Sequence, residues 1–331
     1  MEKKLNIAVL GDGGWGTTLA ILLSGKGHFV TLWGAFPEYI AFMNRGRENK
    51  KFLPGIKIPA RIELSADIRK SASGKDIIVL AAPSQYMRSV MRRLPPPISR
   101  VVYLSASKGI EDKTLLRMSE VIKEEAGGVD LAVLSGPTIS FEVAREIPTS
   151  AVVASTKENI AKDVQRLFSR EQFRIYRSTD IIGLEIGGSL KNIIAIAAGI
   201  LDGLGLGANS KAALLTRGLV EITRLGVAAG AKRDTFMGLS GLGDLVTTCI
   251  SPHGRNRWFG EQIGRGKKPA GILKNTEMAI EGVPTAKSAY KLAKRYKIEM
   301  PIVEQVYNVI YRNKSPRLAV KELMARPLKT E

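Results

Sequence analysis

The stretch Leu5–Ala20, LNIAVLGDGGWGTTLA, places four glycines between an apolar run and a run rich in alanine and leucine. Asn6–Leu10 (NIAVL) has the pattern of a buried parallel strand, and Thr17–Ser24 (TTLAILLS) has that of a helix. The glycines therefore lie between a predicted strand and a predicted helix. That order predicts an α/β fold whose first turn carries a ligand.

The glycine loop, Gly11–Gly16, has the spacing G-x-G-x-x-G of a dinucleotide-binding turn. Gly11 would allow the tight turn, Gly13 would let a pyrophosphate approach the backbone, and Gly16 would let the helix pack close to the strand. The free N–H groups at the start of the helix would then face the phosphates. We therefore expect Gly11, Gly13, Gly14 and Gly16 to bind a dinucleotide cofactor.

The sequence leaves the choice between NAD and NADP open. A second strand is predicted at His28–Trp33, and the residue that reads the adenosine ribose should stand near its end. An acidic residue there would favour NAD, and a nearby arginine would favour NADP. This chain has Gly34, Ala35 and Phe36 at these positions, which give neither signal.

The rest of the chain predicts two domains with different architectures. Strand and helix patterns alternate in the first half, which predicts a doubly wound parallel sheet. Further strands are expected at 61–64, 76–82, 100–105, 131–135, 150–154 and 173–176, and later helices at 187–201, 211–229, 258–265, 285–297 and 301–311. We therefore expect an α/β domain over residues 1–183 and an all-α domain over residues 184–331.

Composition excludes several classes of protein. The net charge of +19 comes from lysines and arginines spread along the chain, without a nucleic-acid-binding motif, so we expect no nucleic-acid partner. A diffuse positive charge instead attracts small anions. One cysteine, Cys249, and two histidines, His28 and His253, predict neither a disulfide framework nor a metal site. The longest apolar run, Ile193–Leu201, falls short of the ~20 residues of a membrane span, so we expect a soluble cytoplasmic protein.

Polar residues that follow strands or interrupt apolar helices are candidates for chemistry. Lys108 follows a predicted strand and is either a cation in the cofactor cleft or a solvated surface lysine. Lys191 shares a helical face with Ala195 and Ala198, which predicts either a buried functional amine or a lysine that reaches solvent. Arg255 and Arg257 suit a phosphate or, alternatively, surface ion pairs.

Seven segments together resemble the NAD(P)-dependent glycerol-3-phosphate dehydrogenase family. They are GDGGWGTTLA at 11–20, SKGIE at 107–111, GPT with EVA and PT at 136–149, GGSLKNIIAIAAGI at 187–200, GLSGLGDLVTTC at 238–249, GRNR at 254–257 and AIEG at 279–282. The resemblance spans nearly the whole chain. It implies an N-terminal Rossmann domain, a helical C-terminal domain, a homodimer, and interconversion of dihydroxyacetone phosphate and sn-glycerol 3-phosphate, which supplies phospholipid synthesis.

The resemblance also implies roles for individual residues. Lys191 would be the catalytic acid and base, with Lys108 as a neighbouring cation that lowers its pKa and Asp244 orienting it. The implied substrate residues are Lys108, Gly136, Thr138, Lys191, Asp244, Gly254, Arg255 and Asn256, and the implied cofactor residues are Gly11, Gly13, Gly14, Trp15, Gly16, Lys108, Ser140, Arg255, Ala279 and Glu281. Trp15 would place its ring beside the cofactor or, alternatively, in the core.

This chain departs from the family pattern at several of these positions. Gly254 stands where serine is common and loses a hydroxyl, and the usual arginine after the second strand is missing. Two rival functions remain: a related dehydrogenase acting on another small anionic hydroxy or keto substrate, or a non-catalytic nucleotide-binding regulator. The segments around Asp244 and Arg255 favour the first-named family.

Overall fold

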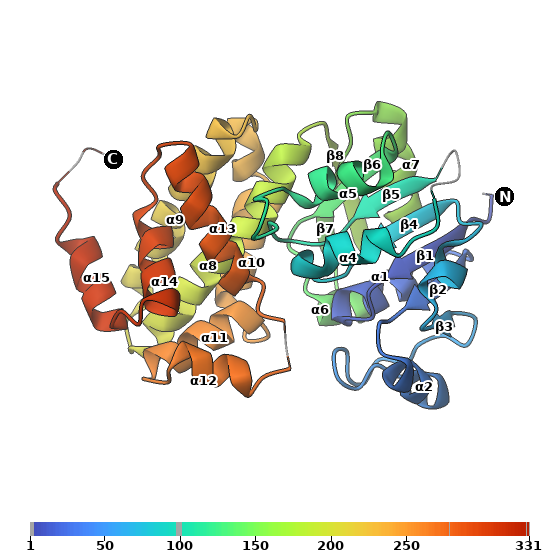
Figure 1. The fold of residues 1–331 in the computed structure, drawn as a ribbon, viewed down its shortest axis with the longest axis horizontal. Coiled ribbons are helices and arrows are strands. Elements are labelled where there is room, and N and C mark those ends of the chain that lie inside the picture. The colour runs from blue at the N-terminus through green and yellow to red at the C-terminus, as the bar shows by residue number, and fades with distance from the viewer. Residues whose placement is uncertain (1–2, 97–100, 278, 329, 331) are drawn as a thin grey trace. The chain divides into compact units, whose positions relative to one another are not determined.

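The computed structural model describes residues 3–96, 101–277, 279–328 and 330 (Figure 1). The chain forms two compact units. The first, here called the sheet unit, comprises Met1–Lys108 and Arg117–Leu184, and the second, the helical unit, comprises Gly109–Leu116 and Glu185–Glu331. The helical unit therefore includes the segment Gly109–Leu116, which lies within the range 1–183 expected for the α/β domain.

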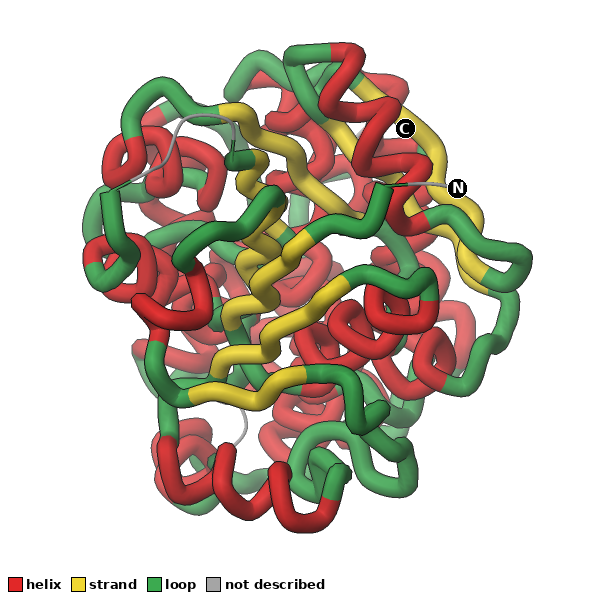
Figure 2. The backbone as a smooth tube through the Cα atoms, turned by 90° about the vertical axis from the view of Figure 1, so that its right-hand side faces the viewer, coloured by secondary structure: helices red, strands yellow, loops and turns green. Residues whose placement is uncertain are grey.

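One eight-stranded sheet organises the sheet unit. Its strands are β1 (Asn6–Leu10), β2 (Phe29–Trp33), β3 (Glu63–Ser65), β4 (Ile77–Leu80), β5 (Val102–Ser105), β6 (Asp130–Ser135), β7 (Thr149–Ala154) and β8 (Phe173–Ser178). They lie in the order β3-β2-β1-β4-β5-β6-β7-β8, which Figure 2 shows as a continuous twisted array. The strand order reverses between β1 and β4, because β2 and β3 lie on one side of β1 and β4 to β8 lie on the other. The glycine loop follows β1 at this switch point. The doubly wound α/β fold is confirmed, although residue 100 of the predicted fifth strand lies outside the described residues.

The expectation of a fully parallel sheet is wrong at one step, because β7 runs antiparallel to β6. The connection between these strands does not cross the sheet. It contains only the short helix α6 (Ser140–Ala144) and returns the chain into the sheet from the edge at which β6 ended. Residues 136–148 consequently stay at the carboxyl edge of the sheet.

Helices α1 (Gly14–Gly25) and α7 (Glu158–Phe168) contact each other and pack on the sheet. Alternate residues of β1, Ile7 and Val9, join Leu19 and Leu23 of α1 in the main core of this unit. This alternation is expected of strands whose successive side chains point to opposite faces. The remaining helices are α2 (Pro37–Gly46), α3 (Ile68–Ala72), α4 (Met87–Arg92, after a 3₁₀ turn at Ser84–Tyr86) and α5 (Met118–Ala126).

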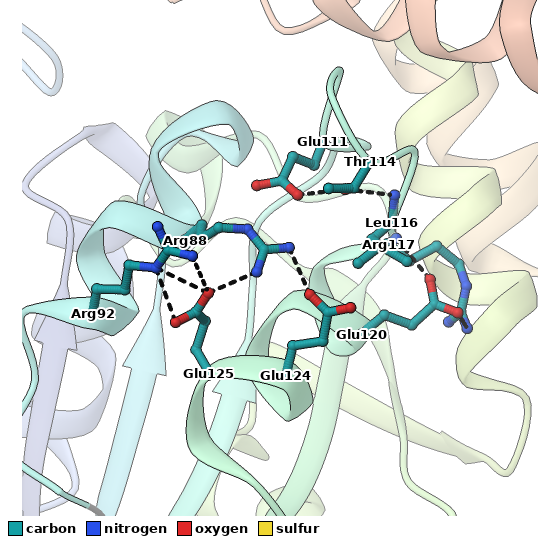
Figure 3. A network of polar contacts seen from close by, with 9 residues as sticks. All are labelled: Arg88, Arg92, Glu111, Thr114, Leu116, Arg117, Glu120, Glu124 and Glu125. Atoms are coloured by element: carbon teal, nitrogen blue, oxygen red, sulfur yellow. Dashed lines mark hydrogen bonds and ion pairs between the residues drawn. The ribbon is translucent and has the colours of Figure 1, made fainter.

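An ion-pair network joins α4 to α5 (Figure 3). Arg88 lies 2.6 Å from Glu125 and 2.8 Å from Glu124, while Arg92 lies 3.1 Å from Glu125. Arg88 and Glu125 are largely buried, so water screens their pairing less than it screens an exposed pair. This network holds the two helices in one register.

Helices make up nearly all of the helical unit, as the sequence predicted. They are α8 (Ile181–Gly203, whose first turn belongs to the sheet unit), α9 (Ala208–Ala228), a 3₁₀ helix (Arg233–Met237), a π-helical turn (Leu239–Gly243), α10 (Asp244–Ile250), α11 (Arg255–Gly264), α12 (Pro269–Lys274), α13 (Gly282–Arg295), α14 (Pro301–Tyr311) and α15 (Pro316–Met324). Asp112 accepts hydrogen bonds from Lys287 and Lys291 of α13, which holds the segment 109–116 in this unit.

Of the described residues, one helix, α8, is long and apolar enough to cross a membrane. The protein interior buries 94% of its most apolar 18-residue window. The apolar composition of α8 therefore belongs to a core helix, around which the other helices pack.

Four glycines bring α8 and α11 into backbone contact. Gly199 and Gly203 of α8 and Gly260 and Gly264 of α11 are each spaced four residues apart, so each pair lies on one face of its helix. A methyl group at Gly260 would overlap the carbonyl oxygen of Ile196, and one at Gly264 would lie 2.8 Å from the Cα atom of Gly203. No larger residue fits between these helices.

We predict that Gly260→Ala lowers the free energy of unfolding by about 2 kcal/mol or more, because the added methyl group forces α8 and α11 apart. Gly271→Ala is a matched control on α12, since a methyl group there meets no atom within 4 Å. It should be neutral or stabilise the protein by up to ~1 kcal/mol. Denaturant unfolding of both variants checks this, and equal midpoints would contradict the close packing.

A buried carboxyl group anchors the start of α14. Glu221 of α9 is 3% exposed and accepts hydrogen bonds from the backbone N–H groups of Ile302, at 2.8 Å, and Val303, at 3.1 Å. Burial raises the pKa of Glu221 from its ordinary value of 4.5 to about 7, although the two N–H groups act in the opposite direction. The folded protein therefore holds this proton more tightly than the unfolded chain.

We predict a pH dependence of stability that Glu221→Gln removes. The stabilisation from the proton on Glu221 is complete below pH 4.5 and is lost as the pH rises through about 7. Between pH 5 and pH 8 the wild type should lose about 2 kcal/mol relative to the variant. Urea unfolding across this range tests it, with Glu304→Gln on α14 as the control. Parallel stability profiles for wild type and Glu221→Gln would refute it.

Candidate functional site

The glycine loop has the geometry of a phosphate cradle. Gly11 has φ +126°, which favours glycine, and a methyl group at Gly16 would overlap the carbonyl oxygen of Gly11. At Gly13 a methyl group would meet no described atom within 4 Å, so the space in front of this residue is open. Gly13 precedes α1, and no described side chain caps that helix. The residues present therefore fit a dinucleotide whose phosphates lie on the start of α1.

The side chain of Asn49, which the sequence analysis did not single out, holds the glycine loop in place. Its side chain is fully buried and its amide donates hydrogen bonds to the carbonyl oxygen of Asp12, at 2.7 Å, and to the hydroxyl of Thr17, at 2.8 Å. Its amide oxygen accepts from Tyr39 and from the backbone of Phe52. An asparagine in an irregular segment carries no signal of this role in a single sequence.

The ring of Trp15 bears on the two alternatives considered for it. Its ring is partly buried and packs against the core of the sheet unit. Its indole Nε1 is buried and has no hydrogen-bond partner among the described residues. The core alternative is thus met in part, and a contact of the ring with the cofactor stays a prediction.

Lys108 and the segment after β6 come together at the carboxyl edge of the sheet. The ammonium of Lys108 donates to the carbonyl oxygen of Gly136, at 2.8 Å, and to the hydroxyl of Thr138, at 3.3 Å. Ser140 begins α6, and its carbonyl oxygen accepts from Thr18 of α1 at 3.0 Å. Lys108 is thus a positioned, partly buried cation rather than a freely solvated one.

Lys191 lies at the centre of the helical unit and is 6% exposed. Its ammonium forms an ion pair with Asp244, which is 1% exposed, and donates to the hydroxyl of Thr248 at 2.7 Å. Thr248 in turn donates to the Asp244 carboxylate at 3.3 Å. A buried charge requires such partners, because leaving it unpaired away from water is costly.

A backbone contact sets the position of this pair. A methyl group at Gly187 would lie 2.7 Å from the carbonyl oxygen of Ser240. Lys191 lies four residues after Gly187, and Asp244 lies four residues after Ser240. Their side chains therefore meet about one helical turn beyond the backbone contact. Sequence patterns did not single out Thr248. It lies four residues after Asp244 in α10, a helix that those patterns did not predict, and therefore on the same helical face.

Asn256 of α11 links three helices. It is buried, donates to the side-chain oxygen of Asn192 at 3.0 Å, and accepts from the backbone N–H of Gly282 at 2.9 Å. Gly254 precedes α11, and a methyl group there would lie 3.0 Å from the carbonyl oxygen of Thr248. A side chain at position 254 would therefore crowd the start of α11.

The two arginines beside Asn256 differ in their surroundings. Arg257 donates to Asp202 at 2.7 Å, and Lys211 pairs with the same carboxylate, so the ion-pair alternative holds for Arg257. Arg255 is exposed at the first position of α11, where Glu281 acts on it electrostatically. Ala279 lies two residues before Glu281 and is partly buried.

Cys249 and the metal-ligating residue types carry no further site among the described residues. Cys249 is fully buried, as expected, and burial raises the pKa of its thiol to about 12. Among the described residues, no three His, Cys, Asp or Glu side chains gather as metal ligands would. The sheet unit thus gathers a phosphate cradle with Lys108, and the helical unit gathers a buried ammonium with Asp244 and Thr248. The ammonium has the chemistry of a proton donor.

Two family models match the chain. The model of the N-terminal half of NAD-dependent glycerol-3-phosphate dehydrogenases matches residues 6–161, and the model of their C-terminal half matches residues 180–321. A glycerol-3-phosphate dehydrogenase [NAD(P)+] of Syntrophotalea carbinolica is 52% identical over 99% of both chains. The corresponding protein of Geobacillus kaustophilus is 47% identical, over 98% of this chain and 96% of its own. The crystal structure of glycerol-3-phosphate dehydrogenase from Coxiella burnetii is 38% identical, with a TM-score of 0.94, and covers 98% of this chain and 99% of that one.

Proposed function

The chain belongs to the NAD-dependent glycerol-3-phosphate dehydrogenase family, and on that premise we propose that Lys191 is its catalytic acid and base. The protein is an oxidoreductase that interconverts dihydroxyacetone phosphate and sn-glycerol 3-phosphate with NAD(P)(H). The observation that carries the role of Lys191 is its burial within the apolar helix α8, in contact with Asp244 and Thr248. A buried ammonium is costly without a partner, and here the partner also orients it.

The nicotinamide, when bound, supplies or accepts the hydride. In the reductive direction, the Lys191 ammonium stabilises the negative charge that develops on the C2 oxygen of the substrate and then donates a proton to it. Asp244 orients the amine, and Thr248 contacts both Lys191 and Asp244. In the oxidative direction, neutral Lys191 accepts the proton from the C2 hydroxyl.

Arg255 and Lys108 are the proposed anchors for the rest of the ligand. The guanidinium of Arg255 suits the substrate phosphate, since guanidinium binds phosphate oxygens through two N–H groups. Asn256 has two of its polar atoms engaged within the protein, so we assign it chiefly to holding α11 in position. Gly136, Thr138, Ser140, Gly254, Ala279 and Glu281 remain proposed ligand contacts on the family resemblance.

The rival functions are less well supported. A non-catalytic regulator has no need of a buried lysine in an ion pair, and the full-length identity of 52% is to a glycerol-3-phosphate dehydrogenase. We further propose, from the family resemblance, that the enzyme is a cytoplasmic homodimer that supplies glycerol 3-phosphate for phospholipid synthesis, with domains at 1–183 and 184–331. Oxidation of NADH and NADPH with and without dihydroxyacetone phosphate tests the activity. No substrate-dependent oxidation with either cofactor would reject it.

We predict that Lys191→Ala lowers kcat by about 10³-fold or more and changes KM only a few-fold, because the proton donor is lost while the phosphate anchor remains. Lys211→Ala is the matched control, since it also removes a lysine paired with an aspartate in the helical unit, and Asp202 keeps Arg257. The variant's cofactor affinity and unfolding midpoint show that it is folded. Turnover close to wild type would rule out the assigned role.

We predict that Arg255→Ala raises KM for dihydroxyacetone phosphate by about 10-fold or more, because a charge-assisted hydrogen bond to phosphate is worth ~1.5–3 kcal/mol. Arg265→Ala, which removes an exposed arginine at the other end of α11, is the control. Inhibition by inorganic phosphate should weaken in parallel in the Arg255 variant. An unchanged KM together with unchanged phosphate inhibition would refute the contact.

A further inference from the structure

The residue that follows β2 has no side chain with which to bind a ribose. The residue after this strand commonly reads the adenosine ribose in dinucleotide-binding folds, by accepting hydrogen bonds from its hydroxyls. Here Gly34 occupies that place and has no side chain. Its backbone N–H donates to Ser65 at 3.1 Å, which holds the strand end against β3. The ribose therefore has no acidic reader on β2.

Asp12, in the glycine loop, fills the space that Gly34 leaves. A methyl group at residue 34 would overlap the Oδ2 atom of Asp12 and lie 2.6 Å from its Cγ atom. The loop and the strand end are fixed to each other, because the backbone N–H of Gly11 donates to the carbonyl oxygen of Trp33 at 3.0 Å. The carboxylate of Asp12 thus stands where the side chain of a β2 residue would begin.

The carboxylate of Asp12 has acceptor capacity left over. Its Oδ2 atom is buried and has no hydrogen-bond partner among the described residues. Burial raises the pKa of Asp12 above its ordinary value of 3.8, while its own backbone N–H and the nearby charge of Lys51 act in the opposite direction. A buried acceptor without a donor is unfavourable, and hydroxyl groups of a ligand would relieve it.

The backbone of Asp12 is held firmly, so the carboxylate does not simply turn away. Asn49 donates to its carbonyl oxygen at 2.7 Å, and the Thr17 hydroxyl lies 3.4 Å from the same atom. Tyr39 and Lys51 are the titratable groups that interact electrostatically with Asp12, and the Tyr39 hydroxyl is itself engaged with Asn49. The backbone position from which the carboxylate extends is therefore fixed by the loop.

We propose that Asp12 is the ribose-reading residue of this enzyme, supplied by the glycine loop instead of by β2, and that it makes the enzyme prefer NAD(H) to NADP(H). The proposal rests on the assignment of the cofactor to the glycine loop. The carboxylate accepts hydrogen bonds from the 2′- and 3′-hydroxyls of the adenosine ribose. A 2′-phosphate would remove one of these donors and bring negative charge against the carboxylate.

The test uses two probes that carry no nicotinamide, ADP-ribose and 2′-phospho-ADP-ribose, with calorimetric binding to the purified full-length chain. We expect the wild type to bind ADP-ribose at least about 10-fold more tightly, which corresponds to ~1.4 kcal/mol. Asp12→Asn, which keeps the shape and removes the charge, should reduce this ratio to within about 3-fold. Asp12→Ser provides a second variant that also lacks the charge.

Asp130→Asn is the control, because it removes one carboxylate from the opposite end of a strand in the same unit and should leave the ratio unchanged. Equal or tighter binding of the 2′-phosphate probe by the wild type would overturn the proposal, as would an unchanged ratio in both Asp12 variants. If the wild type binds neither probe, the cofactor site on the glycine loop fails as well. Dehydrogenase activity measured in parallel separates that failure from failure of the proposed reaction.

Discussion

Backbone contact between α8 and its neighbours is the constraint on which the helical unit depends. Gly187 touches the turn before α10, and further along the same helix Gly199 and Gly203 touch α11. With the backbones this close, the side chain of Lys191 is largely buried and pairs with Asp244. The same packing that excludes larger residues thus supplies both the burial and the partner that orient the lysine, and its proposed role as proton donor depends on both.

The sheet unit solves a comparable problem by a change of strand direction. Because β7 runs antiparallel to β6, the segment between them remains at the carboxyl edge. Gly136 and Thr138 hold the Lys108 ammonium there, and Ser140 binds α1 through Thr18. A right-handed crossover helix at this point would have carried the chain away from that edge. The polar contacts around Lys108 are therefore a consequence of topology as much as of residue type.

Sequence patterns predicted the parts of this structure that local chemistry determines. The strand, glycine loop and helix follow from adjacent residues, and the burial of Lys191 follows from the apolar face it shares with Ala195 and Ala198. Other features depend on contacts between distant segments. Asn49 is fully buried against the glycine loop, although it lies more than 30 residues after the loop in the sequence. The direction of β7 depends on the edge at which the connection from β6 returns to the sheet. The proximity of the Asp12 carboxylate to Gly34 likewise depends on how the loop and the end of β2 pack, and no local pattern indicates it.

The burial of Cys249 has a practical consequence. It is the chain's single cysteine, its thiol is fully buried, and its pKa of about 12 keeps it in the unreactive protonated form at neutral pH. A cysteine introduced at an exposed position would then be the one site that a maleimide reagent modifies in the folded protein. A fluorophore or spin label placed in this way on either unit would report changes around the labelled position during turnover, without first removing a native thiol.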